Sequence, residues 1–170
     1  MLEKNKAKDT LNKIDEELSV AEKFINYLNK KERRDFVFPF HPADFGFDAE
    51  SYSRSKPRER LRMEIVKSDF RAHKELGEKG KYVRSRTPEE KIQVIIIEPI
   101  IHKGRKNKYS PEFKKDIVLL IDGWWTFYED ELNDFKNKYL NSYKFLKKTG
   151  FKEIWFIHMK KDGLIYKLYP

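Results

Sequence analysis

VIIIEPII (residues 94–101) and DIVLLIDGWW (residues 116–125) are the two stretches of the sequence that decide the expected fold. Both contain nearly continuous apolar runs, and the first is rich in β-branched isoleucine and valine. Such runs are typical of strands that are covered on both faces of a sheet. We therefore expect two neighbouring central strands. If they pair as a hairpin, Glu98 and Asp122 lie opposite each other, or nearly so, with Cβ atoms about 5 Å apart.

The remaining pattern predicts helices and strands around these two runs. Apolar residues recur at helical spacing in three segments, and short β-branched or aromatic runs follow the last of them. The expected elements are a helix over about 10–31, a helix from Pro57 to about 76, a weak strand over 81–86, a helix from Thr126 to about 148, and strands over 154–157 and 164–169. Helices and strands mixed in this way predict an α/β (α+β) architecture.

The composition is that of one highly charged domain. The 170 residues are 39% apolar and 38% charged, and an aromatic content of 15% predicts a core rich in rings. There is no cysteine, which excludes disulfides, thiolate zinc sites and cysteine nucleophiles. The apolar run 117–121 is too short to span a membrane, and the N-terminal residues lack a signal-peptide core, so we expect a cytoplasmic protein. The abundance of Lys, Glu and Ile fits a thermophile or a low-GC genome.

The chain divides into three segments within a single compact domain. Residues 1–34 form an expected amphipathic helix, residues 35–56 an aromatic and proline-rich loop, and residues 57–170 the α/β core. In the first segment, apolar residues alternate at spacings of three and four, which is a short heptad pattern. These residues are Leu11, Ile14, Leu18, Ala21, Ile25 and Leu28. The heptad either pairs with a second copy in a homodimer or lies across the domain's own sheet, and we favour the second arrangement.

The net charge of +9 is concentrated in two basic segments. The first contains Arg54, Arg58, Arg60 and Arg62, and the second contains Lys103, Arg105, Lys106 and Lys108. Clustered cations can dock phosphates, and each phosphate that they neutralise adds a salt-sensitive increment of affinity. The segments therefore predict a nucleic-acid surface, although such clusters also serve simply as solvated, charged loops.

The C-terminal third carries a motif-like pattern. Its pieces are Lys136, Tyr139 or Tyr143, Gly150, the strand Glu153-Ile154-Trp155, and a closing strand through Ile165, Tyr166, Lys167 and Leu168. This pattern resembles the end of Uma-type members of the PD-(D/E)xK nuclease superfamily, and a looser likeness covers residues 57–169. The resemblance implies a restriction-endonuclease-like core of order αβββαββ. In that core a mixed central sheet is flanked by helices, here with an extra N-terminal helix.

The resemblance also implies a metal site. In the superfamily, an acid on the second core strand and an acid on the third bind a divalent cation, with a lysine close by. Carboxylate oxygens suit Mg²⁺, which activates water for hydrolysis. The implied catalytic residues are Glu98, Asp122 and Lys136, and the implied metal ligands are Glu98, Asp122 and Asp116.

One position departs from the superfamily pattern. Asp122 is followed by Gly123 and Trp124 where an acid-x-lysine motif is expected, while Glu64 or Asp69 could act as auxiliary acids. The expected function is a nucleic-acid-processing hydrolase, a divalent-metal-dependent endonuclease-like phosphodiesterase. The alternative is a non-catalytic nucleic-acid- or protein-binding module on a degenerate nuclease-like fold. The sequence has neither a phosphate-cradling glycine loop nor a nucleophile elbow, so it gives no indication of a small-molecule enzyme.

Overall fold

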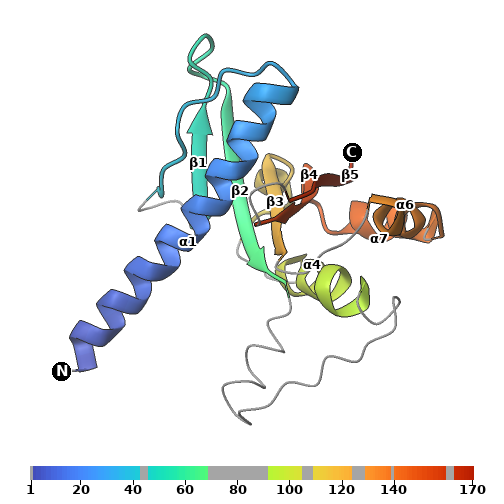
Figure 1. The fold of residues 1–170 in the computed structure, drawn as a ribbon, viewed down its shortest axis with the longest axis horizontal. Helices are drawn as coiled ribbons and strands as arrows, with labels where there is room; N and C mark the ends of the chain where they lie inside the picture. The colour runs from blue at the N-terminus through green and yellow to red at the C-terminus, as the bar shows by residue number, and fades with distance from the viewer. Residues whose placement is uncertain are drawn as a thin grey trace.

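The computed structural model describes residues 2–42, 46–68, 92–104, 109–123, 129–138, 140–159 and 163–170. It shows an α+β fold in which helices flank a mixed five-stranded sheet (Figure 1). The elements are α1 (Leu2–Lys31), β1 (Ala49–Tyr52), β2 (Arg60–Lys67), the π-helical turn η1 (Gln93–Ile97), α4 (Glu98–Gly104), α5 (Pro111–Lys114), β3 (Ile117–Gly123), α6 (Glu129–Lys138), α7 (Leu140–Lys148), β4 (Glu153–His158) and β5 (Ile165–Tyr169).

The sheet has the strand order β1-β2-β3-β4-β5. The three central strands β2, β3 and β4 are parallel, and β1 and β5 are antiparallel to their neighbours. Isolated bridges from Phe36 to Ser53 and from Phe40 to Glu50 add a short antiparallel segment beside β1. Within the part of the chain that the structure describes, no helix is both long and apolar enough to cross a membrane.

Helix α1 covers one face of the sheet. Val20, Ala21, Phe24, Ile25 and Leu28 of α1 pack in one cluster with Met63, Ile65, Val118, Leu120, Trp155 and Ile157 of the sheet. The heptad pattern thus serves the domain's own core from residue 20 onward, which confirms the second of the two expected arrangements for this half of the helix. The first turns of α1 extend beyond the sheet, and Leu11 is 62% exposed (Figure 1). A homodimer through these turns stays a prediction.

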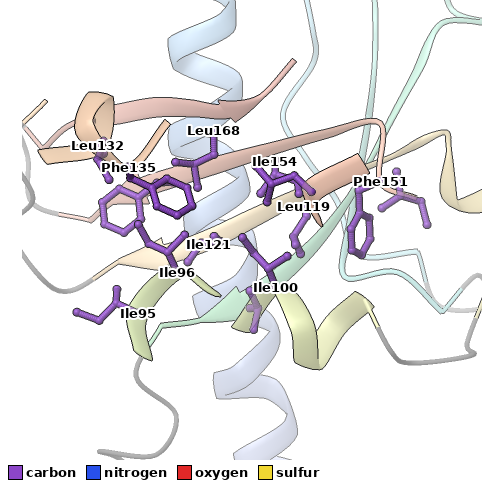
Figure 2. Packing of buried hydrophobic residues seen from close by; sticks show 14 residues of the cluster. Ile95, Ile96, Ile100, Leu119, Ile121, Leu132, Phe135, Phe151, Ile154 and Leu168 are labelled. Carbon is purple, nitrogen blue, oxygen red and sulfur yellow. The ribbon is translucent and has the colours of Figure 1, made fainter. Parts of the chain in front are cut away.

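Helices α4, α6 and α7 cover the opposite face. The alternate residues of β3 and β4, among them Ile117, Leu119, Ile121, Ile154 and Phe156, point to this side. They pack against Ile95, Ile96 and Ile100 of η1 and α4, Leu132 and Phe135 of α6, and Leu146 of α7 (Figure 2). β3 is buried along its whole length because both of its faces are covered, as its continuous apolar run indicated.

The strand expected over residues 92–101 is wrong, because this segment is the helical pair η1 and α4. A short apolar run cannot by itself distinguish a buried strand from a buried helix. Ile96 and Ile100 are both fully buried, four residues apart, which is the spacing of one helix face. Burial against the sheet therefore outweighs the strand preference of the isoleucines.

The helix expected from Pro57 is also wrong, because Arg60–Lys67 is β2. Leu61 and Ile65 fit a helix at a spacing of four, but buried Met63 between them shows the alternation of a strand. Within the described residues the other expected elements agree with the structure: α1, β3, β4, β5, and the helix expected to about 148, which is described as α6 and α7 from Glu129 onward, while its expected start at Thr126 lies outside the described residues. The expected strand 81–86 lies outside the described residues.

Candidate functional site

The β1–β2 hairpin brings Asp48 and Glu64 together. Ala49 lies opposite Met63 in the antiparallel pair, so extending the register by one residue places Asp48 opposite Glu64. The Asp48 amide donates to the Met63 carbonyl oxygen at 3.1 Å, and the Asp48 carboxylate accepts a hydrogen bond from the Ile65 amide at 2.7 Å. Asp48 therefore continues the hairpin past the end of β1, and its carboxylate is fixed against the edge of β2.

Lys103 of α4 places its ammonium group between these two carboxylates. Lys103 Nζ lies 3.3 Å from Asp48 Oδ2 and donates a hydrogen bond to Glu64 Oε1. Asp48 and Glu64 are only 8% and 2% exposed. Burial works to lower the pKa of Lys103, but the charges of Asp48 and Glu64 outweigh it, and the pKa is raised. Lys103 is therefore a charged lysine in a buried site, here named the Asp48–Glu64–Lys103 cluster.

Tyr109 links the cluster to the loop that precedes β1. Its hydroxyl oxygen lies 2.6 Å from Glu64 Oε2 and 2.7 Å from the Gly46 carbonyl oxygen. Burial and the hydrogen bond to Glu64 raise the pKa of Tyr109, so the phenol remains protonated at neutral pH. The ring packs against Phe113, and Phe113 lies 6.2 Å from Phe47 between ring centroids. One hydroxyl and a group of rings thus couple the position of this loop to that of Glu64.

A cavity of about 220 Å³ opens beside the cluster, at the carboxyl ends of β2 and β3. This edge of parallel strands is where α/β sheets commonly bind ligands. Charged groups of both signs line the cavity, including Glu17 of α1, Lys67 of β2 and Asp122 of β3. Burial and then the Asp48 carboxylate raise the pKa of Glu17, against the effect of Lys13 at 3.3 Å. Glu17 thus holds a proton more readily than an ordinary glutamate.

The two carboxylates of the cluster are the best-placed potential metal ligands. Among the residues that the structure describes, no three His, Cys, Asp or Glu side chains form a group that could hold an ion. Mg²⁺ does not need such a cage, because it usually keeps several waters and binds through one or two carboxylates and a substrate phosphate. Asp48 and Glu64 could supply that pair, and the ammonium group of Lys103 already occupies a position that favours positive charge.

The hairpin expected to pair Glu98 with Asp122 does not form. Glu98 begins helix α4 and therefore does not lie opposite Asp122 in a pair of strands. Its catalytic role stays a prediction. Asp122 is 4% exposed at the carboxyl end of β3 and lines the cavity together with Lys103. Gly123 follows it because a Cβ there would lie 2.2 Å from Phe156 Cζ. Packing thus fixes the residue next to Asp122.

Asp116, the other acid expected to bind the metal, lies far from Asp122 along the same strand. Asp116 precedes β3, its side chain is 67% exposed, and it pairs with Arg62 at 3.9 Å. Six residues of strand, at about 3.3 Å each, separate Asp116 from Asp122 by about 20 Å. The two therefore cannot bind one ion. Lys136 belongs to α6, but its side chain and the whole of Asp69 fall outside what the structure describes.

The residues expected to contact nucleic acid separate into groups. Arg54 and Arg58 are exposed in the turn between β1 and β2. Arg60 pairs with Glu50 at 3.5 Å, and the guanidinium of Arg62 lies over the Phe113 ring. Lys103 is held between the buried carboxylates of Asp48 and Glu64, and its contact with nucleic acid stays a prediction. Arg105, Lys106 and Lys108, which are also predicted to contact nucleic acid, lie outside the described residues.

Sequence reasoning missed the role of Asp48 and placed Glu64 on a helix. The available signal was the alternation of Leu61, Met63 and Ile65, which predicts a strand with Glu64 on its other face. No local pattern marks Lys103, because its partners lie 39 and 55 residues away along the chain.

The sequence and the fold were compared with known proteins, and none of the comparisons found a match. No protein-family model matches the sequence, no curated protein matches it, and no solved structure matches the fold significantly.

Proposed function

We propose that the protein is a divalent-metal-dependent, endonuclease-like phosphodiesterase of the restriction-endonuclease-like class, and that the Asp48–Glu64–Lys103 cluster is its site. One observation carries the proposal. A partly buried lysine lies between two buried carboxylates from neighbouring antiparallel chain segments, beside a cavity of about 220 Å³. In the superfamily, an acid on each of the second and third core strands binds the cation with a lysine close by, and here the lysine comes from helix α4.

The order of elements supports the proposal. α1, the bridged segment Phe36–Phe40, β1, β2, α4 and β3 follow one another as a helix, three antiparallel segments, a helix and a strand. If the core starts at α1 rather than at Pro57, and the short helix α5 between α4 and β3 is set aside, this order is compatible with the beginning of αβββαββ. In this alignment β1 and β2 are the second and third strands. Asp48 immediately precedes the second strand, and Glu64 lies in the third.

The charged groups have the properties that such a reaction needs. A divalent cation bound by Asp48 and Glu64 would activate water and stabilise the charge of the transition state. Lys103 keeps its positive charge, as its raised pKa shows, and could hold a phosphate oxygen beside the carboxylates. Glu17 has a raised pKa and lines the same cavity, which suits a group that accepts a proton from the attacking water.

The test measures cleavage and metal binding in the same variants. Wild-type protein is incubated with plasmid DNA and with single-stranded DNA and RNA, in Mg²⁺ or Mn²⁺ and in EDTA. We expect cleavage that EDTA abolishes and that Asp48→Asn or Glu64→Gln lowers by at least about 100-fold. Calorimetric titration with Mn²⁺ should show weakened binding in both variants, which separates a lost metal site from a lost substrate contact.

Glu50→Gln is the matched control. Glu50 is a buried carboxylate on the same hairpin, 8% exposed, but its partner is Arg60 rather than Lys103. It should leave cleavage and Mn²⁺ binding unchanged. If Glu64→Gln behaves like Glu50→Gln in both measurements, the cluster is a structural ion pair and the proposal is wrong. The non-catalytic binding module would then be the better account.

A further inference from the structure

A strongly basic surface lies at the end of β2 opposite to the candidate site. The C-terminal turn of α1, the residues that follow it, and the turn between β1 and β2 lie beside each other at this end (Figure 1). Seven exposed basic residues belong to it, here named the basic end: Lys30, Lys31, Arg33, Arg34, Arg54, Lys56 and Arg58. Three acids accompany them, Glu32, Asp35 and Glu59.

Internal hydrogen bonds hold the turn of the basic end in one conformation. The Asp35 carboxylate accepts hydrogen bonds from Ser53 Oγ at 2.6 Å and from the Ser55 amide at 2.7 Å. These bonds lower the pKa of Asp35 to about 2, so it is charged under all ordinary conditions. Ser53 Oγ also accepts from the Lys56 amide at 3.0 Å. The amide of Arg54 donates to the Asp35 carbonyl oxygen at 3.1 Å.

Most of the positive charge of the basic end is not neutralised by acids of the protein itself. Glu32 and Glu59 both lie near Arg34, at 3.9 and 3.5 Å, and Asp35 is committed to the turn. By contrast, Arg60 and Arg62, further along β2, have carboxylate partners of their own. Among the described residues, Arg54, Lys56 and Arg58 form no ion pair.

We propose that the basic end binds the phosphate backbone of the nucleic acid that the candidate site cleaves, an inference that rests on the proposed function. The partner is identified by its chemistry, because a fixed array of exposed cations matches closely spaced phosphates. Arg60, where β2 begins beside the basic end, is four residues before Glu64, and these four steps of strand span about 13 Å. One turn of a duplex is about 34 Å long. A single duplex can therefore contact the basic end and the cluster together.

Binding is tested without metal, so that cleavage plays no part. Fluorescence anisotropy with a labelled duplex of about 20 base pairs, two helical turns, is measured in EDTA over a range of salt. The variant Arg54→Gln/Lys56→Gln/Arg58→Gln should bind at least about tenfold more weakly, and the slope of log K against log salt should fall by about 2 to 3. Circular dichroism checks that the variant is folded.

The matched control is Lys144→Gln/Lys147→Gln/Lys148→Gln. These three lysines are exposed on α7, and replacing them removes the same amount of positive charge from a different surface. The control should change duplex affinity by less than about threefold, as expected from net charge alone. Equal losses in the two variants would overturn the inference, as would a wild-type protein that does not bind DNA in EDTA. A labelled single-stranded DNA serves as a second probe. Equal affinity for the single strand and the duplex, lost alike in the Arg54→Gln/Lys56→Gln/Arg58→Gln variant, would support the basic end as the binding surface and extend the substrate class to single strands.

The outcomes also separate this inference from the proposed function. Glu64→Gln should bind the duplex as well as the wild type while it fails to cleave. If the basic end binds DNA but no metal-dependent cleavage is found, the binding surface stands and the nuclease proposal fails. Binding to anionic phospholipid vesicles, with none to DNA, would assign the basic end to a lipid surface and overturn the inference.

Discussion

The two ends of strand β2 present charge in opposite ways. At the carboxyl end, Glu64 is 2% exposed and lies with Asp48 and Lys103 in a cluster that satisfies its charges internally. At the amino end, Arg54 and Arg58 are exposed on a turn, and the surrounding acids are committed elsewhere. The same hairpin therefore carries a buried ion cluster at one end and an exposed cationic surface at the other.

This difference separates charges that shape the fold from charges that are available for binding. A buried charge is costly unless it is paired and hydrogen-bonded, so the members of the cluster depend on one another. Exposed cations cost the fold little, and an exposed ion pair contributes about 0–1 kcal/mol. We therefore expect substitutions in the cluster to change stability strongly. Substitutions in the basic end should change binding instead.

Lys103→Met should have the largest effect. It leaves Asp48 and Glu64 buried without their shared counter-charge, and removing one partner of a buried ion pair costs about 3–5 kcal/mol. The free energy of unfolding, measured with urea at neutral pH, should fall by about 3 kcal/mol because the site borders a cavity and is not fully dry. Added Mg²⁺ should restore part of the loss if the carboxylates bind the ion.

Lys114→Met provides the control for that result. Lys114 is also buried, at 8% exposure, but it donates to the Gly104 carbonyl oxygen at 2.7 Å and lies over the Phe151 ring. Burial lowers the pKa of Lys114, so its charge contributes less to folding than that of Lys103. We expect a cost of about 1 kcal/mol. If the two variants lose the same free energy of unfolding, the ion pairs of Lys103 with Asp48 and Glu64 add nothing beyond the packing of the lysine side chain.

Tyr109→Phe should have an intermediate effect. It removes the hydroxyl that lies between Glu64 and the Gly46 carbonyl oxygen, and losing its partly buried hydrogen bond to the Glu64 carboxylate costs about 1–2 kcal/mol. The same urea titration measures it. Tyr27→Phe is the comparison, because the Tyr27 ring packs against Trp155 and its hydroxyl makes no hydrogen bond within the described part of the chain. Equal losses in both would show that Tyr109 contributes only its ring.

The elements that the sequence predicts correctly are those whose own apolar pattern indicates their type. The heptad spacing of α1 fits a helix, and the apolar runs of β3, β4 and β5 are short and rich in β-branched or aromatic residues, which favours strands. Two segments carry patterns that fit both a helix and a strand. Leu61 and Ile65 match either period, and residues 94–97 beside Ile96 are continuously apolar, so they show no period of their own. Tertiary burial decides these two segments.

The site was less predictable than the fold because it is assembled from distant segments. Asp48 and Glu64 become partners only when the hairpin register is known, and that register was hidden by the wrong helix at Pro57. Lys103 joins them from α4, a segment expected to be a strand. The class of site, two acids and a lysine, was expected from the resemblance. The residues that fill it in the proposal are different, with Glu64 foreseen only as an auxiliary acid.

Asp35→Asn should have the smallest effect on stability and addresses the basic end. Asp35 has an ordinary pKa of 3.8, which hydrogen bonds from Ser53 and Ser55 lower to about 2 in the folded protein. Because the folded-state pKa is lowered, the stabilisation is fully present above about pH 4 and is lost as the pH falls toward 2. The melting temperature of the variant should therefore lie below that of the wild type at pH 7, and the difference should shrink between pH 4 and pH 2.

The same variant shows whether the fixed shape of the turn matters for binding. Without the charged acceptor, the Ser55 amide, whose hydrogen bond to Asp35 is 2.7 Å long, should exchange its hydrogen faster. If the basic end works as a preorganised array, duplex affinity in EDTA should also fall, although no cation has been removed and one negative charge has been lost. Net charge alone predicts the opposite sign, tighter binding. Tighter binding by Asp35→Asn would mean that the cations act through total charge, and the contrast between the two ends of β2 would then be one of burial rather than of ordered geometry.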